Sequence, residues 1–274
     1  MNKSSSRVIL ITGASSGIGA CCAAYLAERG YRVYGASRSA TAPPGVVPLS
    51  MNVTYDASVS QAIATVLDRE SRIDVLINSA GFGIAGAVED TTIEEAASQF
   101  EVNFFGTLRV CRAVLPIMRR QNAGYVINIG SIGGLIAIPF QGFYSASKFA
   151  LEGLSEALGI EARPFGIHVV LIEPGDHRTG FTQNRRPTAA STGESAYRNR
   201  FERAIARMAS DEQNGPKPDA IARLVHKVID NPRPRLRYTV GPASQRAAVW
   251  LKRLLPNRIV EGIITRYYDH QRSG

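Results

Sequence analysis

Short runs of β-branched and other apolar residues alternate with helix-forming stretches through the first 175 residues. Buried strands are predicted at 7–13, 32–37, 74–81, 124–131 and 167–175, with a further strand at 235–241. Helical periodicity covers about 17–29, 57–70, 92–119 and 144–163. This alternation is typical of right-handed βαβ units around a parallel sheet. It predicts a doubly wound α/β fold in a single domain.

The alternation fades after Gly175, and the stretch 176–215 is rich in Arg, Ser, Thr and Gly. The helix-forming segment "ESAYRNRFERAIARMAS" lies within it. Ligands of open α/β sheets bind at the carboxyl ends of the strands. Because this stretch directly follows a predicted strand, we expect it to form a small helical lid over the ligand site.

A glycine-rich turn, "LITGASSGIG", ends the first predicted strand and opens the first predicted helix. Gly13, Gly17 and Gly19 would let the backbone turn sharply and approach a pyrophosphate, which a helix N-terminus stabilises. The turn predicts a Rossmann-type, dinucleotide-binding fold. A purely structural strand-to-helix turn is the alternative interpretation.

The end of the second strand indicates which dinucleotide is bound. NAD-binding proteins usually place a carboxylate there for the ribose hydroxyls, whereas a 2′-phosphate requires a basic residue. No Asp or Glu occurs between Glu28 and Asp56, and the strand ends with Ser37 and Arg38. These residues favour NADP(H), unless Arg38 is only a solvated loop charge.

Tyr144 and Lys148 lie four residues apart at the start of a predicted helix, so their side chains share one face. A free phenol titrates near pH 10, and a neighbouring ammonium is expected to lower its pKa. Ser131, at the end of the preceding strand, could hold a carbonyl oxygen near the phenol. The pair suits acid–base catalysis, although most such pairs are ordinary surface residues.

Six motifs occur in one order: the glycine turn, "NSAG", "EVNFFG", the serine that ends "INIGS", Y-x-x-x-K and "PG". Together they resemble the short-chain dehydrogenase/reductase family over about residues 7–180. The resemblance implies hydride transfer between a nicotinamide and a carbonyl carbon, with Tyr144 as proton donor and acceptor. It implies that Lys148 lowers the Tyr144 pKa and binds the nicotinamide ribose, and that Ser131 positions the carbonyl. Asn103 would hold a water that links Lys148 to solvent.

The same resemblance implies a cofactor site along the strand ends. Its residues are Thr12, Gly13, Ser15, Ser16, Gly17, Ile18, Gly19, Ser37, Arg38, Asn52, Val53, Asn78, Ala80, Gly81, Tyr144, Lys148, Pro174, Gly175 and Thr179. Pro174 and Gly175 would face the nicotinamide, and Thr179 would reach its carboxamide. Two positions depart from the family pattern. Ser79 replaces the second Asn of Asn-Asn-Ala-Gly, and Asn52 replaces an Asp near adenine.

The loop between Ser131 and Tyr144, "IGGLIAIPFQGF", is almost entirely apolar. Leu135, Ile138, Phe140 and Phe143 are therefore candidate substrate contacts for a hydrophobic ketone, aldehyde or alcohol, or else core residues. The stretch from Tyr144 to Gly175 resembles the 17β-hydroxysteroid and retinol dehydrogenase branch, which implies a steroid-, retinoid- or lipid-like substrate. His177 in the lid is a further candidate contact, or a polar surface residue.

The formal net charge is +9, and most of it lies near the C-terminus: residues 231–274 hold nine Lys or Arg and two acidic residues. Apolar residues recur at helical spacing over about 243–274. Basic amphipathic helices can lie on an anionic membrane surface. Packing on the chain's own domain or on another subunit of a homo-oligomer is the alternative. The localised charge, without a recognition motif, argues against nucleic-acid binding.

Three cysteines, two of them adjacent, indicate neither a disulfide framework nor a metal site. With no leader or long apolar span evident, we expect a cytoplasmic protein, in peripheral contact with membrane if the C-terminal helices bind it. A non-catalytic NADP-binding protein or a membrane-surface binding protein on the same fold is the rival function. The complete set of Asn103, Ser131, Tyr144 and Lys148 argues for the enzyme.

Overall fold

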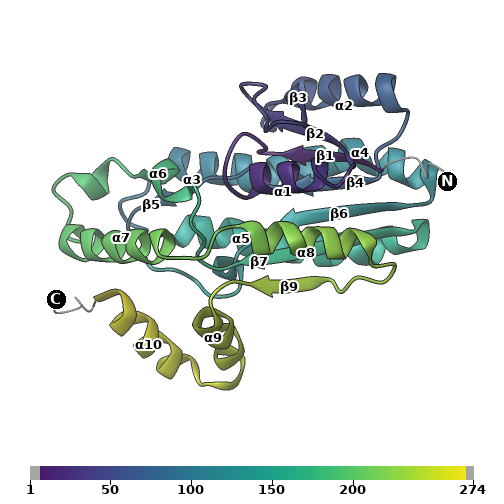
Figure 1. Ribbon diagram of the computed structural model, residues 1–274. Helices are drawn as coiled ribbons and strands as arrows, with labels where there is room; N and C mark the ends of the chain where they lie inside the picture. The colour runs from purple at the N-terminus through teal and green to yellow at the C-terminus, as the bar shows by residue number, and fades with distance from the viewer. Residues whose placement is uncertain (1–6, 270–274) are drawn as a thin grey trace.

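The computed structural model describes residues 7–269, and a seven-stranded parallel sheet runs through them (Figure 1). The strand order is β3-β2-β1-β4-β6-β7-β9. The strands are β1 (Val8–Thr12), β2 (Arg32–Ser37), β3 (Val47–Ser50), β4 (Val75–Asn78), β6 (Gly124–Ile129), β7 (Ile167–Pro174) and β9 (Arg237–Val240). β1 lies between β2 and β4. The strands β2 and β3 are therefore on one side of β1, and β4, β6, β7 and β9 are on the other. The predicted doubly wound, Rossmann-type single domain is confirmed.

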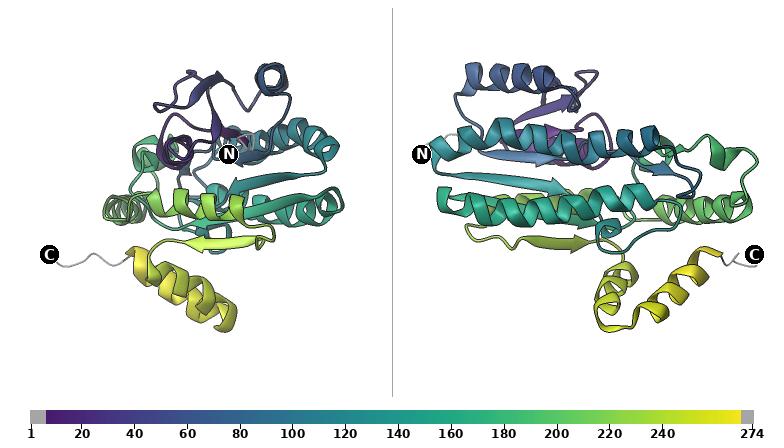
Figure 2. Two further views of the ribbon diagram at one scale, coloured as in Figure 1. Left: turned by 45° about the vertical axis from the view of Figure 1, so that its right-hand side comes forward. Right: turned by 180° about the vertical axis from the view of Figure 1, so that it is seen from behind.

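Helices cover both faces of the sheet (Figure 2). One face carries α1 (Gly17–Ala27) and α8 (Asp219–Asp230), and the other carries α2 (Asp56–Glu70), α4 (Thr107–Gln121) and α5 (Gly142–Ala162). Alternate strand residues enter opposite layers of the core, since side chains of a strand point to opposite faces. In β1, Val8 and Leu10 pack under α2 and α4, whereas Ile9 and Ile11 pack under α1 and α8.

The predicted helix at 92–119 is a continuous but mixed element. It consists of α3 (Ile93–Phe100), a π-helical turn at Glu101–Gly106 and α4. A π-turn inserts an extra residue into the helix, and such turns are frequent at functional sites. This one places Asn103 in the interior, where 1% of its surface is exposed.

Three features of the fold were not predicted from the sequence. Strand β3 is a four-residue edge strand that contains Pro48, which weakens its strand signal. Helix α8 was missed although its apolar residues recur at helical spacing. A second, two-stranded sheet pairs β5 (Ile84–Ala85) with β8 (Arg186–Pro187). Each of its strands is too short to carry a pattern.

The stretch 176–215 forms a cap at one end of the sheet. It contains α6 (Phe181–Asn184), β8, a 3₁₀ turn at Ala190–Thr192 and α7 (Arg198–Gln213). Pairing of β8 with β5 fastens this cap to the segment after β4. The cap therefore has a fixed anchor beside the strand ends.

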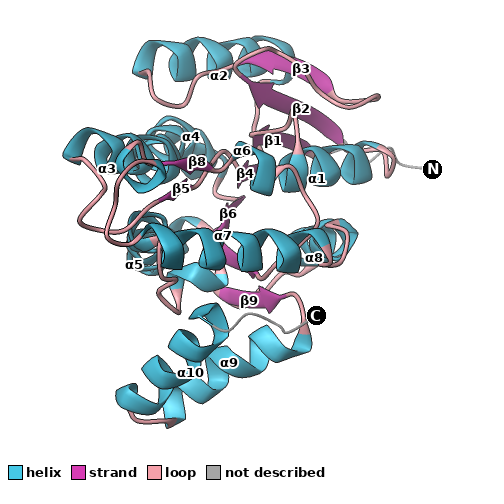
Figure 3. Cartoon of the chain, turned by 90° about the vertical axis from the view of Figure 1, so that its left-hand side faces the viewer, coloured by secondary structure: helices cyan, strands magenta, loops and turns pink. Residues whose placement is uncertain are grey.

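The C-terminal residues form two helices, α9 (Ala243–Leu254) and α10 (Asn257–Asp269). They lie beyond the β9 edge of the sheet (Figure 3), and α10 contacts α7. The predicted C-terminal extension at 243–274 is helical as far as it is described, and residues 270–274 lie outside the described residues. Within 7–269, every helix is too short or too polar to cross a membrane.

Candidate active site

A pocket of about 1140 Å³ lies at the carboxyl ends of the strands and continues under the cap and along α9 and α10. Its walls begin with the glycine turn after β1 and the ends of β2 and β4. They continue with the ends of β6 and β7, the start of α5, and the cap. This is the place where an open α/β sheet binds its ligand.

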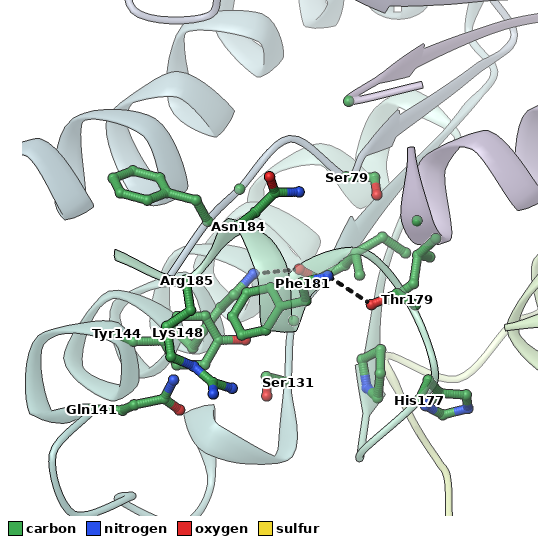
Figure 4. A pocket seen from close by; sticks show the side chains of 18 of the residues that line it. Ser79, Ser131, Gln141, Tyr144, Lys148, His177, Thr179, Phe181, Asn184 and Arg185 are labelled. Atoms are coloured by element: carbon green, nitrogen blue, oxygen red, sulfur yellow. Dashed lines mark hydrogen bonds between the residues drawn. The ribbon is translucent and has the colours of Figure 1, made fainter. Parts of the chain in front are cut away.

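Ser131, Tyr144 and Lys148 lie together in this pocket (Figure 4). Each is at most 8% exposed. Ser131 follows β6, while Tyr144 and Lys148 stand one turn apart on α5, as the spacing predicts. The Lys148 ammonium lies 5.9 Å from the centre of the Tyr144 ring and donates a 2.8 Å hydrogen bond to the Ile129 carbonyl. That bond fixes the ammonium at the end of β6.

The protonation of this group differs from the sequence-based prediction. Burial raises the pKa of Tyr144 to about 12, although hydrogen bonding with Ser131 opposes the rise. Burial also lowers the pKa of Lys148 to about 8, against the attraction of Glu152. The predicted lowering of the Tyr144 pKa by Lys148 is therefore not seen in the protein alone, because desolvation of the phenolate dominates. At neutral pH Tyr144 is a phenol, the form that can donate a proton.

The glycine turn has the close geometry that a dinucleotide site requires. Gly13 has φ +69°, and a Cβ on it would lie 2.8 Å from the backbone of Ala80. A Cβ on Gly19 would lie 2.3 Å from the Gly13 carbonyl oxygen. Ser16, the N-cap of α1, makes no side-chain cap, so its side chain leaves the first N–H groups of the helix uncapped. The turn and helix end therefore fit a pyrophosphate.

Most of the predicted cofactor residues line this part of the pocket. They are Thr12, Gly13, Ser15, Ser16, Gly17, Ile18, Ser37, Arg38, Asn52, Val53, Ala80, Gly81, Pro174, Gly175 and Thr179, besides Tyr144 and Lys148. Arg38 is exposed and forms no ion pair within residues 7–269, whereas the Ser37 hydroxyl is bonded to the Thr41 backbone. Among the described residues Arg38 is thus a cation without an ion-pair partner, next to the end of β2.

Three of the residues predicted for the site, Gly19, Asn78 and Asn103, do not line the pocket. Gly19 lies in the first turn of α1, against the Gly13 carbonyl. The Asn78 amide donates 2.8 Å to Asn128 and so ties β4 to β6. Asn103 is hydrogen-bonded to the segment after β4 and to α5. Its side-chain oxygen accepts from the Phe82 N–H, and its amide donates to the Phe82 carbonyl and to the Ser147 hydroxyl. A water held between Asn103 and Lys148 stays a prediction.

The predicted substrate contacts divide into two groups. Ser131, Ile138 and His177 line the pocket. Leu135, Phe140 and Phe143 do not line it, which favours the alternative that they are core residues, and substrate contact by these three stays a prediction.

Leu135, Phe140 and Phe143 lie near the pocket but make other contacts or point elsewhere. The Leu135 carbonyl accepts a hydrogen bond from Lys252 of α9. The Phe140 ring packs against Phe201 of α7, with centroids 5.9 Å apart. Phe143 is offset by one residue from Tyr144 on α5, and neighbouring helical residues point in different directions. The apolar loop therefore contributes only part of its side chains to the pocket.

The structure adds pocket residues that the sequence analysis did not name. Gln141, the N-cap of α5, lies three residues before Tyr144, outside the helix expected at 144–163. Phe181 packs on the Tyr144 ring, with centroids 5.4 Å apart, and Arg185 forms a buried ion pair with Glu212 of α7. No sequence pattern connects Arg185 with Glu212, because the cap alone brings them together.

Asp176 is another unpredicted pocket residue, and it forms no ion pair within residues 7–269. Burial, together with the charges of Glu212 and Asp211, raises its pKa from 3.8 to about 6, although its bond with Gln245 opposes the rise. The folded protein therefore holds the Asp176 proton more tightly than the unfolded chain does. Ionisation of Asp176 therefore lowers the free energy of unfolding as the pH rises from about 4 to about 6. Above about pH 6 the free energy of unfolding stays lower by the full amount.

The Asp176→Asn variant tests this linkage. We expect it to raise the free energy of unfolding by about 1–3 kcal/mol near neutral pH and to change it little below about pH 4. The asparagine keeps an oxygen that can accept from Gln245, and it carries no charge to desolvate. Urea unfolding at several pH values measures the difference. A gain of the same size at every pH would contradict the assignment.

Comparison with known proteins identifies the family. A family model described as short chain dehydrogenase matches residues 7–190. The chain belongs to the short-chain dehydrogenase/reductase family. As the motifs indicated, this short-chain dehydrogenase also resembles the hydroxysteroid dehydrogenase branch. It is therefore an oxidoreductase of a family that uses NAD or NADP.

Its relatives match it over most of its length. The chain is 44% identical over 263 residues to a 3-ketodihydrosphingosine reductase from Bacteroides thetaiotaomicron, and the match covers 96% of this chain and 98% of the relative. It is 35% identical over 253 residues to 17-beta-hydroxysteroid dehydrogenase type 1 from Homo sapiens, with 84% and 76% covered. A crystal structure of a short-chain dehydrogenase from Streptomyces avermitilis has a TM-score of 0.81, 32% identity and 97% coverage of both chains.

Proposed function

We propose that this enzyme interconverts a long-chain, lipid-like ketone and its alcohol, with NADP(H) as the cofactor. The observation that carries the proposal is the buried phenol of Tyr144, placed beside Ser131 and Lys148 in a pocket of about 1140 Å³. Ligand pockets usually measure about 300–1000 Å³, so this one has room for a cofactor and a long substrate together. The similarity to a 3-ketodihydrosphingosine reductase supports a lipid-like ketone.

The chain's own residues supply the proton and the orientation. Ser131 holds the carbonyl oxygen near the Tyr144 hydroxyl, and Tyr144 donates its proton to that oxygen as the alcohol forms. After this transfer Tyr144 is a phenolate. The Lys148 ammonium, held by the Ile129 carbonyl, stabilises that negative charge. Nicotinamide supplies the hydride when it is bound. In the reverse direction the Tyr144 phenolate accepts the alcohol proton.

One wall of the pocket suits an apolar chain. Its wall contains apolar residues of the loop after β6 and of the C-terminal helices, namely Ile132, Ile136, Ile138, Leu251, Ile263 and Ile264. The direct experiment follows NADPH oxidation with ketones of increasing chain length. Rates that rise with chain length support the proposal. Bound NADPH without turnover of any ketone would favour the rival function, a non-catalytic NADP-binding protein.

We also propose that α9 and α10 contact an anionic membrane surface, from which such a substrate would enter. Leu251, Ile263 and Tyr267 are each more than 40% exposed and also line the pocket, so they form its mouth. Arg246, Arg253, Arg258 and Arg266 are exposed on the same two helices. This excess of positive charge complements an anionic bilayer and would repel the same face of a second copy. Leu251 and Ile263 are 47% and 53% exposed, which favours membrane contact over packing of these two side chains on their own domain.

Trp250 and Leu254 test the membrane proposal, because they are 67% and 75% exposed and lie outside the pocket wall. We expect the Trp250→Ser, Leu254→Ser double variant to bind vesicles of anionic phospholipid at least about tenfold more weakly. The reason is that serine cannot replace the apolar surface that Trp250 and Leu254 would bury in the bilayer. Vesicle flotation measures binding. Ile160→Ser, at an exposed apolar residue of α5, is the matched control.

Two results would overturn the membrane proposal. One is flotation of the double variant equal to that of the unmodified chain. The other is a stable dimer that the double variant dissociates, with no vesicle binding by either protein. Homo-oligomer formation through other surfaces stays a prediction.

A further inference from the structure

Two hydrogen-bond donors beside Tyr144 have no partner among the described residues. They are Nε2 of Gln141 and Nε of Arg185. Gln141 is 3% exposed, and the Arg185 side chain is 4% exposed. A buried donor without a partner carries a desolvation cost, so such groups normally face a ligand or an ordered water. Both residues line the pocket.

The surrounding residues hold these donors at one end of the pocket. Gln141 is the N-cap of α5, three residues before Tyr144. The Arg185 guanidinium lies 5.6 Å from the centre of the Phe181 ring, which packs in turn on Tyr144. In Figure 4 the Gln141 amide and the Arg185 guanidinium extend toward the same region, beside the Tyr144 ring. The donors therefore flank the place where the carbonyl reacts.

The local charge indicates what these donors can bind. Glu212 is 8% exposed and accepts hydrogen bonds from Arg185 and from Thr182. Its carboxylate therefore already compensates the Arg185 cation. An anionic ligand group would meet the Glu212 charge in a site of low polarity, which disfavours it. A neutral oxygen can accept from both donors without adding charge.

We propose that Gln141 and Arg185 form a headgroup subsite, which binds a hydroxyl oxygen carried on the carbon next to the reacting ketone. This inference rests on the proposed function and narrows the substrate class. The preferred lipid has an apolar chain on one side of the ketone and a hydroxyl-bearing head on the other. A plain apolar ketone leaves both donors unpaired, and sites built to bind a hydroxyl discriminate strongly against analogues without it.

The test compares two substrates and three variants. The substrates are a long-chain methyl ketone and the matching hydroxymethyl ketone, which differ only in the headgroup hydroxyl. Gln141→Leu removes the amide, and Arg185→Lys keeps a cation for Glu212 but removes the Nε donor. Asn184→Leu is the matched control, because Asn184 is a pocket amide that lies apart from Tyr144 in Figure 4. The readout is kcat/KM with NADPH.

We expect the unmodified enzyme to prefer the hydroxymethyl ketone by at least about tenfold. Gln141→Leu should lower kcat/KM for that substrate by about 10–100-fold more than for the methyl ketone, so that the preference between the two substrates is lost. Arg185→Lys should act in the same direction, and Asn184→Leu should affect both substrates alike. Equal losses on both substrates in Gln141→Leu would overturn the headgroup subsite while leaving the proposed function intact. Failure of the unmodified enzyme to reduce either ketone, with NADPH bound, would overturn both.

Discussion

The Tyr144→Phe variant should lose about 10³-fold in kcat, because it lacks the group that protonates the carbonyl oxygen. NADPH binding and folding should be largely retained. The substitution keeps the ring that packs on Phe181 and removes only a buried hydroxyl. Loss of NADPH absorbance measures turnover, and fluorescence titration measures cofactor binding.

Tyr197→Phe is a suitable control for this variant. Its hydroxyl donates to Glu89 at an exposed position outside the pocket. It should behave like the unmodified enzyme in both measurements. Normal turnover in Tyr144→Phe would remove the phenol from the mechanism and require another proton donor in the pocket.

Reversal of the charge at Arg38 should change the preferred cofactor. Arg38 is an exposed pocket residue at the end of β2, without an ion pair in the described chain. A charge-assisted bond to the 2′-phosphate contributes about 1.5–3 kcal/mol, and an aspartate would add repulsion. We expect Arg38→Asp to lower kcat/KM for NADPH by about 100-fold or more, while kcat/KM for NADH is preserved or increased.

Arg178→Asp provides the control for the Arg38 experiment, because it makes the same change of charge in the cap at a residue outside the pocket wall. It should affect NADPH and NADH equally. An unchanged ratio of NADPH to NADH use in Arg38→Asp would show that Arg38 does not contact the 2′-phosphate.

The central sheet could be predicted because its strands are buried on both sides. Residues such as Ile9 and Leu10 are fully buried in opposite layers of the core, so β1 reads as an unbroken apolar run. Tyr144 and Lys148 could be predicted because four residues make about one helical turn. The glycine turn follows β1 directly in the chain. Each of these signals is local.

The unpredicted parts of the site depend on contacts between distant segments. Arg185 meets Glu212 only because β8 pairs with β5 and α7 folds back over the pocket. The high pKa of Tyr144 depends on its burial, which the spacing of Tyr144 and Lys148 does not report. Phe140 is apolar in the sequence whether it faces the pocket or α7, so composition alone could not assign it.

Polar contacts join the cap to the C-terminal helices. Arg200 of α7 is paired with Asp269 of α10, and the Tyr267 hydroxyl donates 2.6 Å to Asp211 of α7. Because of these contacts, α7 cannot swing outward without displacing α10 or breaking both bonds. The position of α10 is therefore coupled to that of the cap, so any displacement of α10 would also disturb the α7 wall of the pocket.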